Sequence, residues 1–316
     1  MWRALRRYSH NIYRSYDGTP ASLGHVDKEA ANAALAEYPT VELAHDVYEP
    51  VGTSIVSEYV PPILILHGLF GSKTNNRSVA KQLAKKLDTS IHCIDLRNHG
   101  SSPHLEPHTY PAIANDVEEY IRKYIPRSEK PIVLGHSMGA KTAMAIALRN
   151  KVEISGIVSV DNAPIIAGRT GFSKFGLYVQ ALQRAEGKKS LKECDAVLAQ
   201  VEKSVPVRQF LLTNMKKDDS REGGYYCRVP LDLMRKELDN VSDWPFAATN
   251  TRYNGPALFI RGTQSAYVAD DVIPAIGHFF PQFILEGIDA GHWLIAEKPT
   301  EFIQVLERWI HAREWE

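Results

Sequence analysis

Short apolar runs alternate with amphipathic segments along most of the chain. Residues 62–68 read Pro-Ile-Leu-Ile-Leu-His-Gly, which is apolar on both faces, as expected of a central parallel strand. Residues 76–87 follow with Val79, Leu83 and Leu87 at four-residue spacing, close to the period of a helix. Further strands are predicted at residues 90–95, 131–134, 154–161, 256–262 and 282–288, and further helices at residues 110–125, 140–149, 272–280 and 299–312. This alternation predicts an α/β fold whose mostly parallel sheet has helices on both faces.

The alternation stops between residues 163 and 254, where four helical patterns are expected instead. The third of them runs through Val207, Leu211 and Met215. Because the strand and helix rhythm resumes directly afterwards, we interpret residues 163–254 as a helical cap inserted into one domain that spans residues 40–316.

The segment ahead of the first central strand has a different pattern. Residues 40–59 alternate apolar and polar positions and are broken by Pro50 and Gly52, which predicts an antiparallel hairpin at a sheet edge. The Ala-rich residues 27–38 are expected to form a short helix or a linker, so the domain is predicted to begin near Thr40.

Charge is balanced over the whole chain, with 37 Lys and Arg against 37 Asp and Glu, so no overall field favours nucleic acid. The first twenty residues differ: they hold four arginines, no acid before Asp17, and apolar side chains that can share one helical face. An Arg-rich, acid-free, amphipathic start is typical of a mitochondrial presequence, here residues 1–20, although an ordinary basic tail is the alternative. We therefore expect a mitochondrial protein.

Membrane spans and metal sites are not indicated. No apolar run approaches the about 18 residues that a transmembrane helix needs. Cys93, Cys194 and Cys227 lie far apart and lack the spacing of metal ligands, so they are expected to be reduced, partly buried thiols. His99 and His108 belong to a loose loop cluster with His104, for which metal binding is the weaker interpretation.

The strongest chemical signal is Gly135-His136-Ser137-Met138-Gly139, which stands between an apolar strand and an Ala-rich helix. This is the setting of a nucleophile elbow, in which a serine at the tip of a tight turn has a strained backbone. Larger side chains two positions away would collide with the strand and the helix. Ser137 is therefore the predicted nucleophile, and His136 is expected to pack beside it.

A serine hydroxyl needs an adjacent base, and the base needs an acid that holds its tautomer. His292 lies just past the last predicted strand, where its loop can reach Ser137, and it is the predicted base. The acid has two candidate places. Asp161 follows the strand after the nucleophile helix and is favoured, while Asp270 or Asp271 would occupy the commoner place after the strand at 256–262.

An oxyanion hole can also be predicted. One donor should be the backbone N–H of Met138, and the second should come from the loop after the first central strand, with Leu69 in His67-Gly68-Leu69 as the candidate.

Six segments together carry a resemblance to a known family. They are His67-Gly68-Leu69-Phe70-Gly71-Ser72, Asp95-Leu96-Arg97-Asn98-His99-Gly100-Ser101-Ser102, the Ser137 pentapeptide, Asp161-Asn162-Ala163-Pro164, Arg261-Gly262-Thr263-Gln264-Ser265 and Gly291-His292-Trp293. As a set they resemble the mitochondrial abhydrolase-domain esterases of the α/β-hydrolase fold, which are similar to bacterial YbfF-type esterases and yeast alcohol acetyltransferases. The resemblance implies that Asp161 supplies the acid, and it agrees with a mitochondrial setting.

The implied activity is serine-dependent acyl transfer on small ester or acyl-thioester substrates. Relatives include hydrolases and enzymes that pass acetyl to alcohols, and an acyl-Ser137 could react with water or with an alcohol. Which of the two reactions occurs depends on how well the cap excludes water from the acyl-Ser137. Phe172, Phe175 and Tyr178 form one aromatic stripe on a helix of the cap and could serve this purpose. The alternative role of the stripe is to pack the cap onto the core. No cofactor is expected; acetyl-CoA would be an acyl donor, although no phosphate-binding loop marks its site.

The sequence argues against two other functional classes. A catalytically inactive ligand-binding or scaffold protein of the same fold is the alternative, and an intact Ser, Asp and His argue against it. Epoxide hydrolase or dehalogenase chemistry is disfavoured because it requires a carboxylate at position 137.

Overall fold

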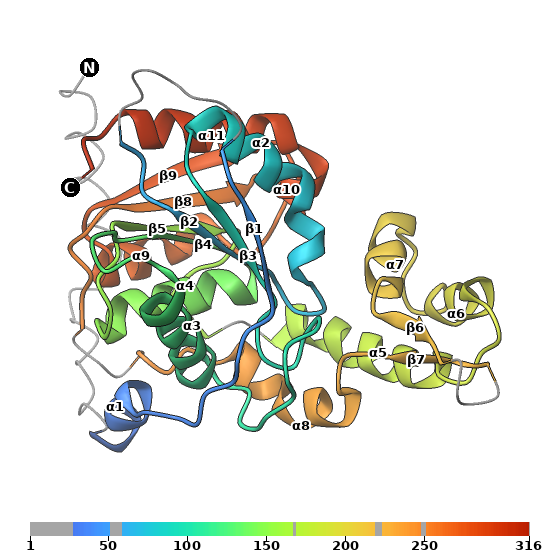
Figure 1. Cartoon of the computed structure of the whole chain (residues 1–316). Coiled ribbons are helices and arrows are strands. Elements are labelled where there is room, and N and C mark those ends of the chain that lie inside the picture. The colour runs from blue at the N-terminus through green and yellow to red at the C-terminus, as the bar shows by residue number, and fades with distance from the viewer. Residues whose placement is uncertain (1–27, 51–58, 167–168, 219–222, 248–250, 316) are drawn as a thin grey trace.

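The structure is a computed structural model that describes residues 28–50, 59–166, 169–218, 223–247 and 251–315. Its centre is a seven-stranded sheet with the order β1-β3-β2-β4-β5-β8-β9, parallel except for β1 (Figure 1). The strands are β1 (His45–Tyr48), β2 (Ile63–Leu66), β3 (Ile91–Ile94), β4 (Ile132–His136), β5 (Gly156–Val160), β8 (Ala257–Gly262) and β9 (Phe283–Ile288). The prediction of an α/β fold with a mostly parallel sheet is confirmed.

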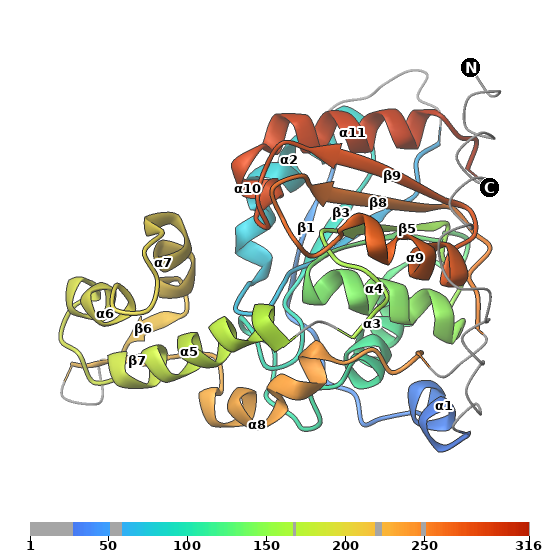
Figure 2. The same ribbon diagram turned by 180° about the vertical axis from the view of Figure 1, so that it is seen from behind.

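Helices cover both faces of this sheet, as Figures 1 and 2 show. Helices α2 (Arg77–Leu87) and α11 (Pro299–His311) lie on one face, and α3 (Tyr110–Tyr124), α4 (Met138–Arg149) and α9 (Ile273–Phe279) lie on the other. Each face has its own apolar core. β2, β3 and β5 are buried at every position because helices shield both of their faces, and β2 accordingly reads as a continuous apolar run.

Two of the core helices end in the same way. α2 is followed by Asp88 and α4 by Asn150, each with a left-handed backbone, at φ 52° and φ 50°. Short polar side chains tolerate this conformation, so each residue ends its helix and directs the chain back toward the next strand.

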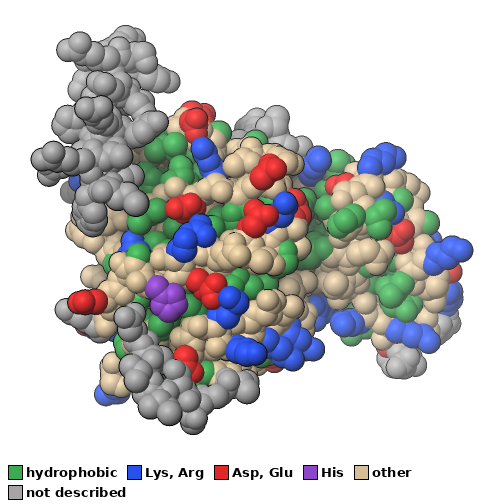
Figure 3. Space-filling model, turned by 90° about the horizontal axis from the view of Figure 1, so that it is seen from above, with side chains coloured by type: hydrophobic (Ala, Val, Ile, Leu, Met, Phe, Trp, Pro, Cys, Tyr) green, Lys and Arg blue, Asp and Glu red, His purple; other side chains and the backbone are tan. Residues whose placement is uncertain are grey.

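The cap lies between β5 and β8 and projects beyond the carboxyl ends of the strands, toward which the arrows of β8 and β9 point in Figure 2. It contains α5 (Arg169–Ala185), α6 (Leu191–Leu198), α7 (Val205–Leu212), β6 (Met215–Lys217), β7 (Tyr225–Cys227) and α8 (Leu231–Ser242). Seen from above, it shows apolar side chains surrounded by lysines and arginines (Figure 3).

One cap prediction was wrong: Met215 does not continue the helix that passes through Leu211. α7 ends at Leu212, and Met215 instead begins β6, which pairs antiparallel with β7. The chain leaves the helix because Asn214 turns it, donating its backbone N–H to the Leu211 carbonyl and accepting from the backbone N–H of Arg228.

The described part of the segment ahead of the first central strand contains one helix and one strand. The short helix expected within residues 27–38 is α1 (Lys28–Leu35), and Arg149 ties it to the domain by donating to the Ala34 carbonyl. β1 pairs antiparallel with β3 at the sheet edge, and the second half of the expected hairpin falls within residues 51–58. Residues 51–58 and the predicted presequence, residues 1–20, lie outside the described residues.

Candidate active site

Ser137 stands at the turn between β4 and α4. Its backbone has φ 54° and ψ −113°, a positive φ that a residue with a side chain rarely adopts. A Cβ built on Gly135 would lie 2.0 Å from the Gly139 carbonyl oxygen, and one built on Gly139 would lie 2.3 Å from the Leu66 carbonyl oxygen. Only glycine fits at both positions, so the local sequence folds into the strained elbow that the pentapeptide predicts.

A chain of hydrogen bonds joins Ser137, His292 and Asp161. The Ser137 Oγ lies 3.0 Å from His292 Nε2, and His292 Nδ1 lies 2.7 Å from Asp161 Oδ2. An ionised carboxylate only accepts hydrogen bonds, so the shared proton resides on Nδ1 and leaves Nε2 free to accept the serine hydroxyl. This is the arrangement in which an imidazole can remove a proton from serine.

Of the three candidate acids, Asp161 contacts His292, whereas Asp270 and Asp271 do not. Asp161 is fully buried, and it accepts hydrogen bonds from the Gly262 N–H at 3.0 Å and the Ser265 hydroxyl at 2.5 Å. Asp270 instead forms an ion pair with Arg261 at the surface, and Asp271 is exposed beside it. The sequence alone assigned no role to Ser265, although residues 261–265 carry part of the family resemblance.

Tyr267 was also missed. Its ring stacks on the His292 imidazole, with centroids 4.1 Å apart and 19° between the planes. Burial, and secondarily the nearby Asp161 carboxylate, raises the pKa of Tyr267 to about 12, so the phenol is neutral. The ring fixes the plane of the imidazole without competing for its protons.

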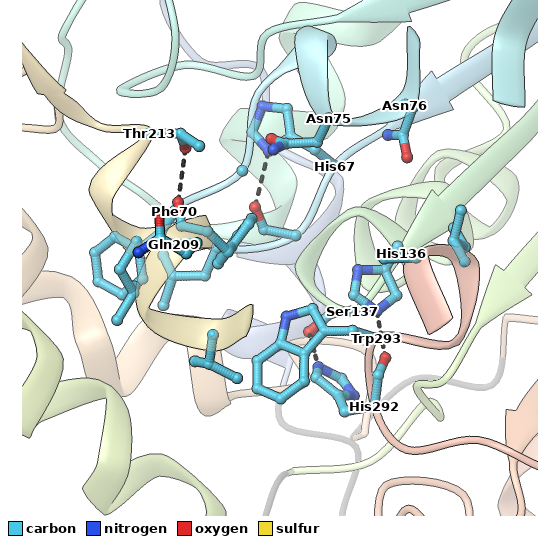
Figure 4. Close-up of a pocket in the computed structure, with 18 of the residues that line it drawn as sticks. His67, Phe70, Asn75, Asn76, His136, Ser137, Gln209, Thr213, His292 and Trp293 are labelled. Atoms are coloured by element: carbon cyan, nitrogen blue, oxygen red, sulfur yellow. Dashed lines mark hydrogen bonds between the residues drawn. The ribbon is translucent and has the colours of Figure 1, made fainter. Parts of the chain in front are cut away.

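His136 holds the loop that carries His292. His136 Nε2 lies 2.7 Å from the backbone carbonyl oxygen of His292, and the two rings are 4.9 Å apart (Figure 4). Burial, followed by the proximity of His292, lowers the pKa of His136 to about 4. His136 is therefore neutral near neutral pH, and it carries its proton on Nε2, because a carbonyl oxygen only accepts.

The two predicted oxyanion donors come from two separate elements near Ser137. Met138 is the first residue of α4, and Leu69 belongs to the loop after β2 and lines the pocket above Ser137. Among the described residues, neither backbone N–H donates a hydrogen bond to another group. Both are thus available to an oxygen bound at Ser137.

A pocket of about 490 Å³ opens over Ser137 between the core and the cap (Figure 4). Its walls are mainly apolar and come from the loop after β2, from α5 and α7, and from Trp293 beside His292. Phe175 and Tyr178 both line it, whereas the side chain of Phe172 lies outside the described part of the structure. A ligand at Ser137 would therefore contact the cap directly.

Two histidines of the predicted loop cluster, His99 and His108, lie close together in the structure. His99 and His108 are buried with ring centroids 5.6 Å apart, and burial lowers the pKa of His99 to about 3. Among the residues described, no cluster of His, Cys, Asp and Glu could hold a metal ion, and no helix is long and apolar enough to cross a membrane. Cys93, Cys194 and Cys227 are buried and unpaired with one another.

Comparison with known proteins decides the family. A profile of the alpha/beta hydrolase fold matches residues 61–191. A Saccharomyces cerevisiae protein named "Probable alcohol acetyltransferase" is 40% identical over 291 residues, which cover 87% of this chain and 84% of the yeast protein. The chain belongs to the α/β-hydrolase fold family. The resemblance found in the sequence is thereby confirmed.

Two further comparisons support the same family assignment for this α/β-hydrolase. A Xenopus tropicalis protein named "sn-1-specific diacylglycerol lipase ABHD11" is 35% identical over 280 residues, 86% of this chain and 83% of that protein. Among solved structures, a "Marine microorganism esterase" aligns with a TM-score of 0.75 at 31% identity, covering 85% of this chain and 100% of that one. The chain is therefore a member of a group of esterase-like and acyltransferase-like proteins.

Proposed function

We propose that this α/β-hydrolase is a serine-dependent acyl-transfer enzyme that acts on carboxylic esters or acyl thioesters. The observation that carries the proposal is the unbroken line of hydrogen bonds from Ser137 through His292 to Asp161, at the base of an apolar pocket. The names of its esterase and acetyltransferase relatives support the same reaction class.

In the proposed reaction, the Ser137 oxygen attacks the substrate carbonyl while His292 Nε2 takes the hydroxyl proton. Asp161 stabilises the resulting imidazolium, and the N–H groups of Leu69 and Met138 bind the oxygen that becomes negative. When the intermediate collapses, His292 returns the proton to the leaving alcohol or thiol. The product is an acyl-Ser137 ester, which a second acceptor cleaves by the reverse steps.

The identity of that acceptor separates hydrolysis from acetyl transfer. Water gives a free acid, whereas an alcohol gives a new ester, and His292 can activate either. Apolar walls supplied by Phe175, Phe210 and Trp293 favour an alcohol over water near Ser137. We therefore propose alcohol acetyltransferase activity accompanied by esterase and thioesterase activity, with acetyl-CoA as a donor substrate and no bound cofactor.

The experiment supplies purified protein with acetyl-CoA, with and without a short alcohol such as ethanol, and quantifies ethyl acetate and free acetate. Ester formation that depends on the alcohol supports the transferase assignment. Acetate alone at every alcohol concentration would reduce the assignment to a hydrolase. If neither product forms, and no ester or thioester is cleaved, the inactive scaffold becomes the better assignment.

The pocket volume favours a second candidate, the hydrolysis of esters with longer acyl chains. Pockets of about 300–1,000 Å³ hold drug-sized ligands, and the volume found here, about 490 Å³, exceeds the needs of an acetyl group and ethanol. A relative named as a diacylglycerol lipase points the same way. A series of p-nitrophenyl esters from acetate to dodecanoate tests this candidate, which predicts that kcat/KM rises with chain length before it falls.

We also propose import into mitochondria, on the basis of the arginine-rich start of the chain. The full chain should reach mitochondria in cells, and replacement of Arg3, Arg6 and Arg7 by serine should leave it in the cytosol. Unchanged import of the substituted chain would contradict the proposal.

A further inference from the structure

The loop that carries Leu69 is a tight turn in a strained conformation. The Gly71 N–H donates to the Gly68 carbonyl oxygen at 2.9 Å, which makes Leu69 and Phe70 the two central residues of the turn. Phe70 has φ 61° at the position where such turns favour glycine or asparagine. A phenylalanine stays in this conformation only when its surroundings hold it there.

The core side of the turn is fixed through one carbonyl group. His67 Nδ1 lies 2.8 Å from the Gly68 carbonyl oxygen, which also accepts from Gly71 (Figure 4). A Cβ built on Gly68 would lie 3.1 Å from the Ser137 Cβ, so the turn rests against the elbow. The Leu69 N–H belongs to the same peptide unit as the Gly68 carbonyl and points the opposite way, because the peptide bond is trans.

The other side of the turn is held by the cap. Asn214, which lies between α7 and β6, is fully buried and donates from Nδ2 to the Phe70 carbonyl oxygen at 2.7 Å. The Arg228 Nε–H donates to Asn214 Oδ1 at 3.4 Å, and this bond orients the amide so that its NH₂ group faces the turn. The Asn214 side chain thus makes a long-range hydrogen bond that maintains the positive φ of Phe70.

We propose that Asn214 is a positioning residue for the oxyanion hole. By holding the Phe70 carbonyl, it keeps the turn in the one conformation that directs the Leu69 N–H toward an oxygen on Ser137. The cap then does more than enclose the substrate, because its hydrogen bond to the turn determines the direction of the Leu69 N–H, one of the two oxyanion donors. This inference rests on the proposed function.

Two substitutions test the proposal. Asn214→Ala removes the amide, and Asn214→Asp keeps its size but replaces the donor with an acceptor that repels the Phe70 carbonyl. Loss of a whole oxyanion donor lowers kcat by about 10²–10³-fold. A displaced donor should therefore lower kcat for a soluble ester about 10- to 100-fold, with KM within about threefold of its original value.

A transition-state analogue gives the readout that a purely structural role would not change. A trifluoromethyl ketone forms a tetrahedral adduct with serine and places its oxygen in the oxyanion hole. Its inhibition constant should rise in both variants by the factor by which kcat/KM falls. A rise in KM with unchanged kcat, or unchanged inhibition by the ketone, would overturn the proposal.

The matched control is Asp195→Asn, which weakens a cap-internal ion pair, Arg208 Nε to Asp195 Oδ1 at 2.8 Å, without reaching the turn. It should keep the original kcat. If both Asn214 variants fail to fold, Asn214 has a structural role and the proposal is wrong. Ester hydrolysis by the unsubstituted protein is measured alongside. If the unsubstituted protein hydrolyses esters, the proposed function holds and a negative result with the Asn214 variants concerns Asn214 alone.

Discussion

The His292 imidazole and the Asp161 carboxylate are 131 positions apart in the sequence and 2.7 Å apart in the structure. Asp161 follows β5 and His292 follows β9, so both lie at the carboxyl edge of the parallel sheet, where the chain can turn over Ser137. Asp161 is fully buried, and its carboxylate accepts hydrogen bonds from the Gly262 N–H, the Ser265 hydroxyl and His292 Nδ1. These donors stabilise a carboxylate that would otherwise be costly to bury.

Asp161→Asn should lower kcat by about 10⁴-fold, because an amide in this place favours the wrong imidazole tautomer. The side chain has nearly the same volume, so the protein should remain folded. Steady-state kinetics with a soluble ester checks the prediction, and Asp270→Asn, which changes only a surface ion pair, is the control. If the two variants had equal activity, Asp161 would not be the acid.

His136→Phe keeps a ring beside the elbow but removes the hydrogen bond to the His292 carbonyl. The loop that carries the base should then shift, and because small misplacements are costly, kcat should fall about 10- to 100-fold with little change in KM. His136→Gln retains an N–H donor and should lose less activity. Kinetics of both variants, with thermal unfolding to show that they fold, measure the effect. Near-normal activity of His136→Phe together with a larger loss in His136→Gln would show that the ring matters and the hydrogen bond does not.

Lys141 makes the stability of the protein depend on pH. Its side-chain nitrogen is buried and donates to the Ser242 and Asp243 carbonyls at the end of α8, at 3.0 Å and 2.8 Å. Burial lowers the pKa of Lys141 from its ordinary 10.5 to about 7 in the folded chain. Between these pH values the unfolded chain holds the proton and the folded chain does not, so the free energy of unfolding should rise with pH.

Lys141→Met removes this titration and supplies the comparison. Urea unfolding at pH 7, 8 and 9 should show the free energy of unfolding of the original protein rising relative to that of the variant. Parallel curves for the two proteins would mean that the lysine keeps its proton in the folded state.

Much of the fold and most of the site follow from short-range patterns. A strand apolar on both faces must be central, and Gly135 and Gly139 flank Ser137 because nothing larger fits the elbow. Asp161 could be favoured because the strand at residues 256–262 is followed by no carboxylate until Asp270. Each of these inferences depends on residues within a few positions of one another.

What the sequence did not predict depends on contacts between distant segments. Tyr267 stacks on His292, and Asn214 bonds to Phe70 across 144 positions, but neither has a local pattern that identifies its partner. The end of α7 before Met215 was missed for a similar reason. The apolar spacing of α7 continues through Met215 into β6, so only the pairing of β6 with β7 shows that Met215 belongs to a strand.

The most direct test of the account is labelling by a fluorophosphonate probe, which phosphonylates only an activated serine. The unsubstituted protein should be labelled at Ser137, identified by peptide mass spectrometry, with concurrent loss of ester hydrolysis. Ser137→Ala should remain unlabelled, and His292→Ala should label far more slowly. Equal labelling of Ser137→Ala, or an unsubstituted protein that does not react at all, would contradict the assignment of Ser137 as the nucleophile.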